Sequence, residues 1–454
     1  MGSPVVLATD GRPAIRACPR LSTIEYTPPM FVLRALIGLL FFCGVAWLFS
    51  SHRRAFPGRV VVFGLAIQLA LAAFILETSI GIVVFQAIAD FVARLIGMTG
   101  EGAALVFGGL SRGDFAEGGW GFAFAFASSG LTVIIFFSAL MGVLYHLGIM
   151  QVLIYGLARI MTTLMGVSGA ESMAMAANVF VGQTEAPLVV RPYIAEMTAS
   201  ELNALMTGGF ATIAGSVLAV YMGLLGAEYG PHLLTASVMS APAAFLIAKI
   251  MLPETESSVT GTKVELKIER SAGNLIEAAA NGTGDGLQLW LNVIAMLIAF
   301  MGLVALVNWP LGWAGEQLVA VGWLTGTLDL GRIFGWVFAP VAWCMGVEGW
   351  HDCQLMGTLL GTKIAVNEFI AFEGMQRMLP GGDPSSTFEH IRSAKMAAYA
   401  LCGFANFASI GIQIGGISPL APERKPAISK LALRAMLGGA FASWMTATVA
   451  GMFL

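Results

Sequence analysis

The chain has 454 residues, of which 57% are hydrophobic and only 11% are charged, and its net charge is −3 at pH 7. A soluble domain carries about 25% charged residues, so this composition, with several apolar runs of about 20 residues, predicts a helical protein that crosses a membrane several times. The small net charge provides no basic surface for a nucleic-acid partner.

The N-terminal third alternates polar pieces with apolar runs. Residues 1–28 are polar and irregular, and we expect a disordered tail there. Apolar runs of spanning length follow at residues 30–50, 60–77 and 122–150. Between the second and third runs, Asp90, Arg94 and Glu101 interrupt residues 80–110 at helical spacing. This pattern favours a helix that lies in the membrane interface over a tilted span with buried charges.

The rest of the chain contains further spans separated by two unusual regions and one long polar connection. An amphipathic piece at residues 151–165 precedes the first unusual region, 168–193, and the second lies at 332–372. Spans are expected at residues 202–225, 233–252, 287–307, 397–417 and 433–454. Residues 253–285 are hydrophilic, and we expect a surface loop there. The resulting division is 1–28 (tail), 29–150 (scaffold), 151–252 (first repeat), 253–327 (polar loop and scaffold helix) and 328–454 (second repeat and last span).

Each unusual region holds one acid among apolar residues, Glu185 in the first and Glu368 in the second. A charged side chain near the middle of a bilayer costs roughly 2.5–3.5 kcal/mol on insertion scales. A purely structural explanation is an ion pair of Glu185 with Arg191 and of Glu368 with Lys363. Spacings of six and five residues, however, place the members of each pair on different faces of a helix. Pairing across helices remains open, and we favour a functional role for both acids.

A weak internal repeat surrounds the two acids. Met165-Gly166-Val167 and Met345-Gly346-Val347 precede them by 18 and 21 residues, counted from each valine (185 − 167 and 368 − 347). Each region is followed by a span with a polar break, at residues 212–216 and 406–409. Transporters often carry paired interrupted segments with the solute between them at the membrane midplane. The pattern therefore predicts two re-entrant hairpins within an inverted repeat.

Two common enzyme motifs are missing from the sequence. It contains no P-loop and no HExxH pattern, which argues against an ATP-driven pump and a zinc enzyme. Its five cysteines show no short metal spacing and favour free thiols. We therefore expect no enzyme and no bound cofactor, although a membrane enzyme in which the two acids do acid–base work stays a distant alternative.

The polar motifs in the apolar regions resemble those of one transporter family, the concentrative nucleoside transporters in their bacterial eight-span form. These motifs are Gly182-Gln183-Thr184-Glu185-Ala186-Pro187, Arg191-Pro192-Tyr193, Asn367-Glu368-Phe369 and Asn406-Phe407-Ala408-Ser409-Ile410-Gly411. The resemblance covers residues 30–454. It implies an all-α polytopic membrane protein with about eight transmembrane helices, two re-entrant hairpins and interfacial helices. It further implies a homotrimer in the inner membrane, with a fixed scaffold and a mobile transport domain.

The resemblance also implies a nucleoside site. The residues expected at the nucleobase are Gln183, Thr184, Glu185, Val217 and Phe404. The residues expected at the ribose hydroxyls are Glu368, Asn406 and Ser409. The chemistry is suitable, because ionised carboxylates only accept hydrogen bonds and ribose hydroxyls can donate them. Charge-assisted bonds of this kind are about twice as strong as neutral ones.

A sodium ion is the coupling ion that the resemblance implies. Its ligands would be the side chains of Asn178 and Thr212 and the carbonyls of Val181, Thr212 and Ile213. Unwound helices expose such carbonyls. Proton coupling through Glu185 or Glu368 remains an alternative. So does a gate-type membrane protein that uses nucleoside-recognition hairpins without transport.

Overall fold

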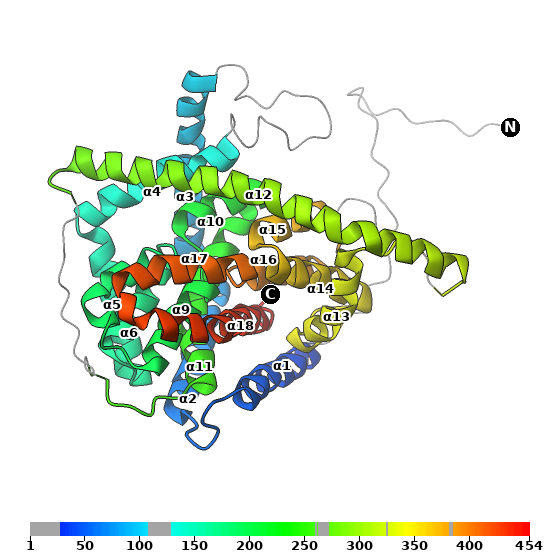
Figure 1. Cartoon of the computed structure of the whole chain (residues 1–454), viewed down its shortest axis with the longest axis horizontal. Helices are drawn as coiled ribbons and strands as arrows, with labels where there is room; N and C mark the ends of the chain where they lie inside the picture. The colour runs from blue at the N-terminus through cyan, green and yellow to red at the C-terminus, as the bar shows by residue number, and fades with distance from the viewer. Residues whose placement is uncertain (1–27, 108–128, 259–260, 262–271, 324–325, 381–384) are drawn as a thin grey trace.

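The computed structural model describes residues 28–107, 129–258, 261, 272–323, 326–380 and 385–454. All regular structure in these segments is helical (Figure 1). Five described helices are long and apolar enough to cross a membrane, and the number rises to seven if each of two bent helix pairs is counted as one span. The tail expected at residues 1–28 lies almost entirely outside the described residues.

The N-terminal helices follow the expected apolar runs. They are α1 (Pro28–Leu48), α2 (Gly58–Glu77), α3 (Ser79–Phe107), α4 (Ser129–His146) and α5 (Ile149–Met165). The 29 residues of α3 form one helix that is long and apolar enough to cross a membrane. Its charged side chains Asp90, Arg94 and Glu101 are exposed and not buried, so an interfacial position for this helix stays a prediction. The expected span at 122–150 is described only from Ser129, and α4 bends into α5 by 77°.

The first repeat contains a helical hairpin, a broken helix and a span. The hairpin is α6 (Gly169–Asn178), a turn, α7 (Ala186–Val189) and α8 (Arg191–Ile194). The broken helix is α9 (Ala199–Ala211) and α10 (Gly215–Leu225); η3 (Ala227–Tyr229) and the span α11 (Gly230–Met251) follow. The unwound residues 212–214 lie within the expected polar break, where small residues weaken a helix.

The connection between the repeats differs from the expectation. We expected a loop over 253–285, a span at 287–307 and amphipathic material to residue 329. The structure instead has one helix, α12 (Leu275–Ala320), of 46 residues. Its start is fixed by Asn274, whose side chain accepts a hydrogen bond from the backbone N–H of Glu277 at 2.9 Å. Residues 275–280 are mostly good helix formers, so the helix begins well before the apolar run. It continues through residues 281–286, which are poor helix formers, because Gly282 and Gly286 pack against the backbone of α4.

The second repeat has the same order of parts. It comprises α13 (Leu330–Met345), α14 (Trp350–Ala365), α15 (Glu368–Arg377), α16 (Ile391–Leu401), α17 (Phe407–Ile417), η4 (Ser418–Leu420), η5 (Pro422–Arg424) and α18 (Lys425–Ala450). The region 332–372 is therefore divided by a bend of 112° between α13 and α14. The second hairpin is α14 with α15, and α13 precedes it as α5 precedes the first hairpin.

Details of the two repeats agree. The glycines of the two Met-Gly-Val triplets, Gly166 and Gly346, end α5 and α13 with φ of 72° and 94°, which only glycine adopts easily. The C-terminal ends of α9 and α16 meet: a Cβ built on Gly403 would lie 2.8 Å from the carbonyl oxygen of Ala211. Two half-helices that approach one point with the same end are what an inverted repeat requires.

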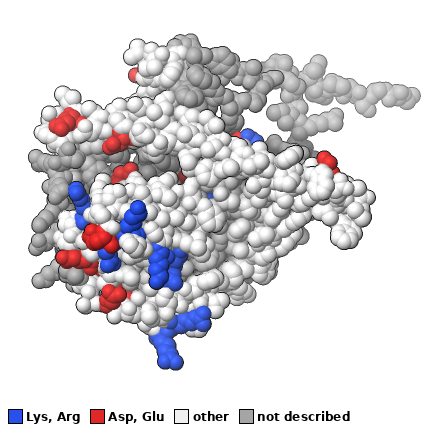
Figure 2. Space-filling model, in the orientation of Figure 1, with Lys and Arg blue, Asp and Glu red and all other residues white. Residues whose placement is uncertain are grey.

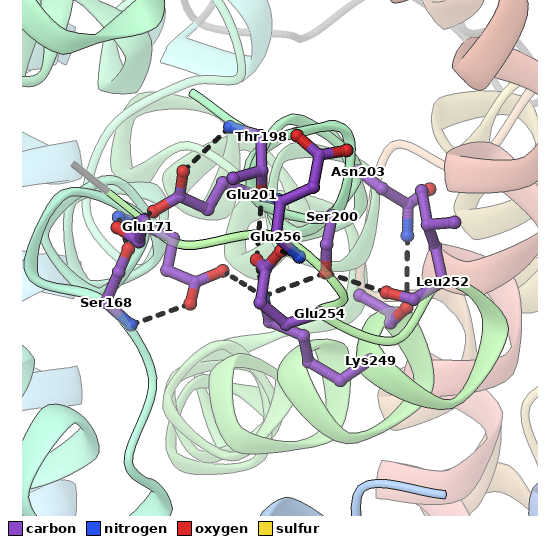
Figure 3. Close-up of polar contacts among 12 residues, drawn as sticks. Ser168, Glu171, Thr198, Ser200, Glu201, Asn203, Lys249, Leu252, Glu254 and Glu256 are labelled. Carbon is purple, nitrogen blue, oxygen red and sulfur yellow. Dashed lines mark hydrogen bonds and ion pairs between the residues drawn. The ribbon is translucent and has the colours of Figure 1, made fainter. Parts of the chain in front are cut away.

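A buried ion-pair cluster joins three elements of the first repeat (Figure 3). Lys249, at the end of α11, lies 2.8 Å from Oε2 of Glu171 on α6 and donates to Oγ of Ser200 on α9 at 3.0 Å. Glu171 also accepts from the backbone N–H of Ser168 and completes the cap of α6. We call these residues the Lys249 cluster. It fixes the start of the hairpin, the start of the broken helix and the end of the span to one another.

The second repeat has a counterpart, which we call the Arg392 cluster. Arg392, near the start of α16, pairs with Glu348 before α14 at 3.2 Å and donates to the carbonyl of Gly451 after α18 at 3.0 Å. It also donates to the carbonyl of Gly346. The same three parts are therefore joined in both repeats, although the charged residues come from different elements.

The surface is mostly apolar. Figure 2 shows a face of largely uncharged residues, with the charged side chains gathered at its lower left, where Figure 1 places α5, α6 and α11. Along α12, large apolar side chains are exposed, including Ile298, Leu306 and Trp309. This helix packs closely on α4, because a Cβ on Gly282 would clash with the carbonyl oxygen of Ser138. Its other faces need lipid or another protein surface.

Candidate functional site

The centre of the candidate site is the turn between α14 and α15. Asn367 caps α15, because its side chain accepts a hydrogen bond from the backbone N–H of Ile370 at 2.9 Å. Glu368 is therefore the first residue of that helix, where its negative charge is favourable. Its Oε1 accepts from the hydroxyl of Tyr221 at 3.1 Å, and its Oε2 accepts from Nδ2 of Asn406 at 2.8 Å.

Asn406 holds its place by capping another helix. Its Oδ1 accepts from the backbone N–H of Ser409 at 2.7 Å, which starts α17. The amide orientation leaves Nδ2 to donate to Glu368, so one side chain links the second hairpin to the second broken helix. Both residues are buried.

The turn of the first hairpin reaches the same helix. Nε2 of Gln183 donates to Oγ of Ser409 at 3.2 Å, and Nε2 of Gln413 donates to Oε1 of Gln183 at 3.1 Å. Gln413 also donates to the carbonyl of Met206 on α9. The start of α17 therefore contacts both hairpins, with Glu368 on one side and Gln183 on the other. We call Gln183, Tyr221, Glu368, Asn406, Ser409 and Gln413 the polar group of the site.

Thr184 and Glu185 lie beside this polar group and form no hydrogen bond to it among the described residues. Oγ1 of Thr184 donates to Oε1 of Glu185 at 3.0 Å. The carboxylate folds over Gly182, because a Cβ built there would meet Oε2 of Glu185. The glutamate is exposed, whereas Glu368 is buried. Of the two acids that we expect to converge on one solute, Glu368 lies within the polar group and Glu185 lies at its edge.

The two apolar residues expected at the site flank the polar group. Val217 is buried on α10, and Phe404 is half-buried in the break between α16 and α17. The aromatic ring of Tyr221 stacks on that of Phe372 at 4.2 Å between centroids, which fixes the phenol against Glu368.

Sequence reasoning missed Tyr221 and Gln413. Each lies four residues after a residue that was singled out, Val217 and Ser409, and therefore shares a helix face with it. A search for polar side chains one turn from each candidate would have found both.

A second group of oxygens lies at the break between α9 and α10. Asn178, the last residue of α6, is 1% exposed, and neither its Oδ1 nor its Nδ2 has a hydrogen-bond partner in the described part of the chain. The amide lies at the last turn of α9, where a Cβ on Gly208 would be 3.1 Å from Nδ2. Thr212 is also buried, and its hydroxyl donates to the carbonyl of Gly208 at 2.9 Å.

The backbone at this break offers further oxygens. The carbonyls of Val179 and Phe180 accept hydrogen bonds from Ser237 and Gly215. For the carbonyls of Val181, Thr212 and Ile213, no such bond is formed among the described residues. A buried amide without partners beside free carbonyls has the composition of a site for a hard cation such as sodium.

The fold and these two groups define a class: a multi-pass membrane transporter in which two hairpins and two broken helices surround a polar site. Sequence models of known protein families match successive parts of the chain and agree with this class. The N-terminal and C-terminal models of the Na⁺-dependent nucleoside transporters match residues 37–110 and 232–451, and a nucleoside-recognition (Gate) model matches residues 128–228. The chain belongs to the Na⁺-dependent nucleoside transporter family.

Individual relatives cover nearly all of the chain. An uncharacterized transporter of Haemophilus influenzae is 44% identical over 94% of this chain and 98% of its own length. The mouse sodium/nucleoside cotransporter 1 is 39% identical over 92% of this chain, which spans 63% of the longer mouse protein.

Solved structures support the same assignment. The transporter CNTnw in an inward-facing, substrate-bound state has a TM-score of 0.84 at 39% identity, covering 93% of this chain and 98% of that one. An outward-facing variant of CNTnw gives 0.85 at 38% identity, covering 94% and 99%. The transporter family and the all-helical fold class that we predicted from the sequence are therefore confirmed. The Gate model alone covers only the middle of the chain, so the gate-type alternative explains less than the transporter family does.

Proposed function

We propose that this protein is a symporter that imports nucleosides with sodium across the inner membrane. The observation that carries the proposal is the polar group at the start of α17, which contacts both hairpin turns and presents a buried carboxylate. The mouse relative is a sodium/nucleoside cotransporter, which supports the same substrate and ion.

Within this site we assign the ribose to Glu368, Asn406 and Ser409. Glu368 accepts hydrogen bonds from Tyr221 and Asn406 in this structure, and ribose hydroxyls are donors of the same kind. The nucleobase is assigned to Gln183, Thr184 and Glu185, with Val217 and Phe404 as apolar contacts. Gln183 carries both a donor and an acceptor, so it can pair with polar edges of different bases.

Sodium is assigned to the break of the first broken helix, with Asn178, Val181, Thr212 and Ile213 as ligands. The unpartnered amide of Asn178 supports this assignment, because a buried polar group without a partner is costly unless a ligand satisfies it. Proton coupling through a carboxylate would leave that amide unexplained.

We also propose a homotrimer with a scaffold of α4 and α12 and a transport domain built from the two repeats. The exposed apolar length of α12 supports an interface between copies in the bilayer. In the division expected from the sequence, residues 29–150 and 253–327 belong to the scaffold, and residues 151–252 and 328–454 form the two transport repeats.

The test is uridine uptake into proteoliposomes with and without an inward sodium gradient at fixed pH. We expect uptake to require sodium, and unlabelled uridine to compete far better than uracil because uracil lacks the ribose. Uptake driven by a pH gradient alone would refute sodium coupling. Equal competition by uracil would refute the ribose assignment.

The Glu368→Gln variant tests the carboxylate itself. Gln presents a donor where the sugar also donates, so uptake should fall by about 10²-fold or more if two charge-assisted bonds are lost. The trimer should still form by native mass spectrometry. Wild-type uptake by this variant would contradict the proposed role.

A further inference from the structure

Lys363 is a buried lysine that the site described above does not use. It lies in the last turn of α14 and is 0% exposed. Its Nζ donates to the carbonyl of Ala400 at 2.9 Å and to Oγ of Ser443 on α18 at 2.9 Å. Ser443 donates its own proton to the carbonyl of Ala440, so its oxygen is an acceptor for the ammonium group.

The position of Ala400 explains why a cation is favourable there. Ala400 lies in the last turn of α16, which ends at Leu401 because the chain unwinds over residues 402–406. The last carbonyls of a helix lack intrahelical partners and carry the negative end of its dipole. The backbone N–H of Cys402 bonds the carbonyls of Ala398 and Tyr399, and the ammonium of Lys363 satisfies that of Ala400.

The first repeat has the same arrangement with a different side chain. Asn178 lies at the end of α6, the first arm of its hairpin, and reaches the last turn of α9, the first half of its broken helix. Lys363 likewise comes from the first arm of its hairpin and reaches the last turn of α16. The helices α6, α9 and α10 contain no lysine or arginine, so the carbonyl oxygens at the first break have no resident cation from these helices.

We propose that the ammonium group of Lys363 is a resident cation that takes, in the second repeat, the place that a mobile cation takes in the first. The inference rests on the proposed sodium coupling and deepens it. One break binds an exchangeable ion, and the other holds the ammonium group of the chain itself. Lys363 thereby limits the protein to one coupling ion for each nucleoside.

The test replaces the ammonium by a neutral oxygen ligand in Lys363→Gln, with Lys363→Arg as the matched variant that keeps the charge. Uridine uptake by each protein in proteoliposomes is measured against sodium concentration, and the charge moved per nucleoside is taken from the reversal potential. In the glutamine variant we expect a second sodium ion to enter, so the Hill coefficient should rise from about one to about two. The charge per nucleoside should double, while Lys363→Arg should keep the wild-type value.

Several results would overturn the proposal. An unchanged Hill coefficient and charge in an active Lys363→Gln protein would show that the lysine does not replace an ion. If this variant unfolds in sodium-free detergent, saturating sodium should restore its melting transition, and failure at every sodium concentration would also contradict the proposal. Sodium-independent uptake by the wild-type protein is a separate outcome, which refutes the proposed function before any variant is compared.

Discussion

Glu368 is held in place by donors from two different broken helices, and this arrangement determines how the carboxylate can act. The hydroxyl of Tyr221 on α10 reaches one oxygen, and the amide of Asn406 before α17 reaches the other. Each carboxylate oxygen has further lone pairs, so a ligand can donate to it without displacing either partner. The two protein donors fix the direction in which those free lone pairs point.

Tyr221→Phe tests this positioning role. The substitution keeps the stacking on Phe372 and leaves a buried carboxylate one donor short, which costs about 1–3 kcal/mol. We expect a higher half-saturation concentration for uridine, by roughly 5–100-fold on that scale, in a protein that still folds. Tyr229→Phe, outside the polar group, is the control and should behave as wild type. An unchanged half-saturation concentration in Tyr221→Phe would mean that the phenol does not orient Glu368.

At the residue scale, the sequence indicated the members of the polar group that lie in recognisable motifs, and it missed the members that lie outside those motifs. Glu368 stood out because an acid in an apolar run is expensive. Tyr221 and Gln413 are ordinary in a helix, and only the packing of α10 and α17 against the hairpins reveals their contacts. The place of Glu185 at the edge of the group also depends on that packing.

At the scale of elements, the Lys249 and Arg392 clusters each connect a hairpin, a broken helix and a span. The prediction of paired hairpins and breaks from two Met-Gly-Val triplets and two lone acids agrees with the helices observed. The clusters themselves were not predictable, because their charged partners are separated by 78 residues (249 − 171) and 44 residues (392 − 348), and different residue types stand at corresponding places. The length of α12 was missed because its first turns are polar.

Lys249→Met should destabilise the protein strongly. It leaves Glu171 buried without its cation, and breaking a buried pair in this way costs roughly 3–5 kcal/mol. Thermal unfolding in detergent measures the loss. Combining it with Glu171→Gln should recover part of the stability, since the uncompensated charge is gone. Arg377→Met, which removes an exposed pair with Glu373, is the control and should change little. Equal melting temperatures for Lys249→Met and Arg377→Met would contradict the role of the cluster.

Gly282→Ala tests the packing of α12 on α4. The added methyl group would meet the carbonyl of Ser138, so the two helices must separate. We expect a lower melting temperature. Gly284→Ala, two residues away, has nothing within 4 Å and should be neutral or stabilising by about 0.5–1 kcal/mol, since alanine favours a helix. If both variants melt alike, close approach of these helices is not needed.

The whole molecule combines a long exposed helix with two interlocked repeats. At 1.5 Å per residue α12 is about 69 Å long, whereas the apolar core of a bilayer is about 30 Å thick. The helix therefore tilts steeply or extends beyond the membrane. In Figure 1 it crosses the upper part of the view from left to right, and most elements of both repeats lie below it. This arrangement is suitable for a fixed scaffold helix past which the two repeats move.

Movement of the first hairpin is testable with a single cysteine at Ala186, which is fully buried. The five native cysteines, Cys18, Cys43, Cys344, Cys353 and Cys402, are replaced first. If the repeats move together during transport, uridine should change the rate at which a membrane-impermeant thiol reagent labels Ala186→Cys. Labelling that is indifferent to uridine with and without sodium would count against a moving hairpin.

The contact between the two breaks has a thermodynamic consequence. Gly403 lies against the carbonyl of Ala211, so the unwound segment beside Asn406 touches the end of the helix beside Thr212. A ligand that reshapes one break must then alter the free energy of filling the other. Such an effect is reciprocal: if sodium tightens uridine binding by a given factor, uridine tightens sodium binding by the same factor. Titration calorimetry in both orders of addition should return equal factors.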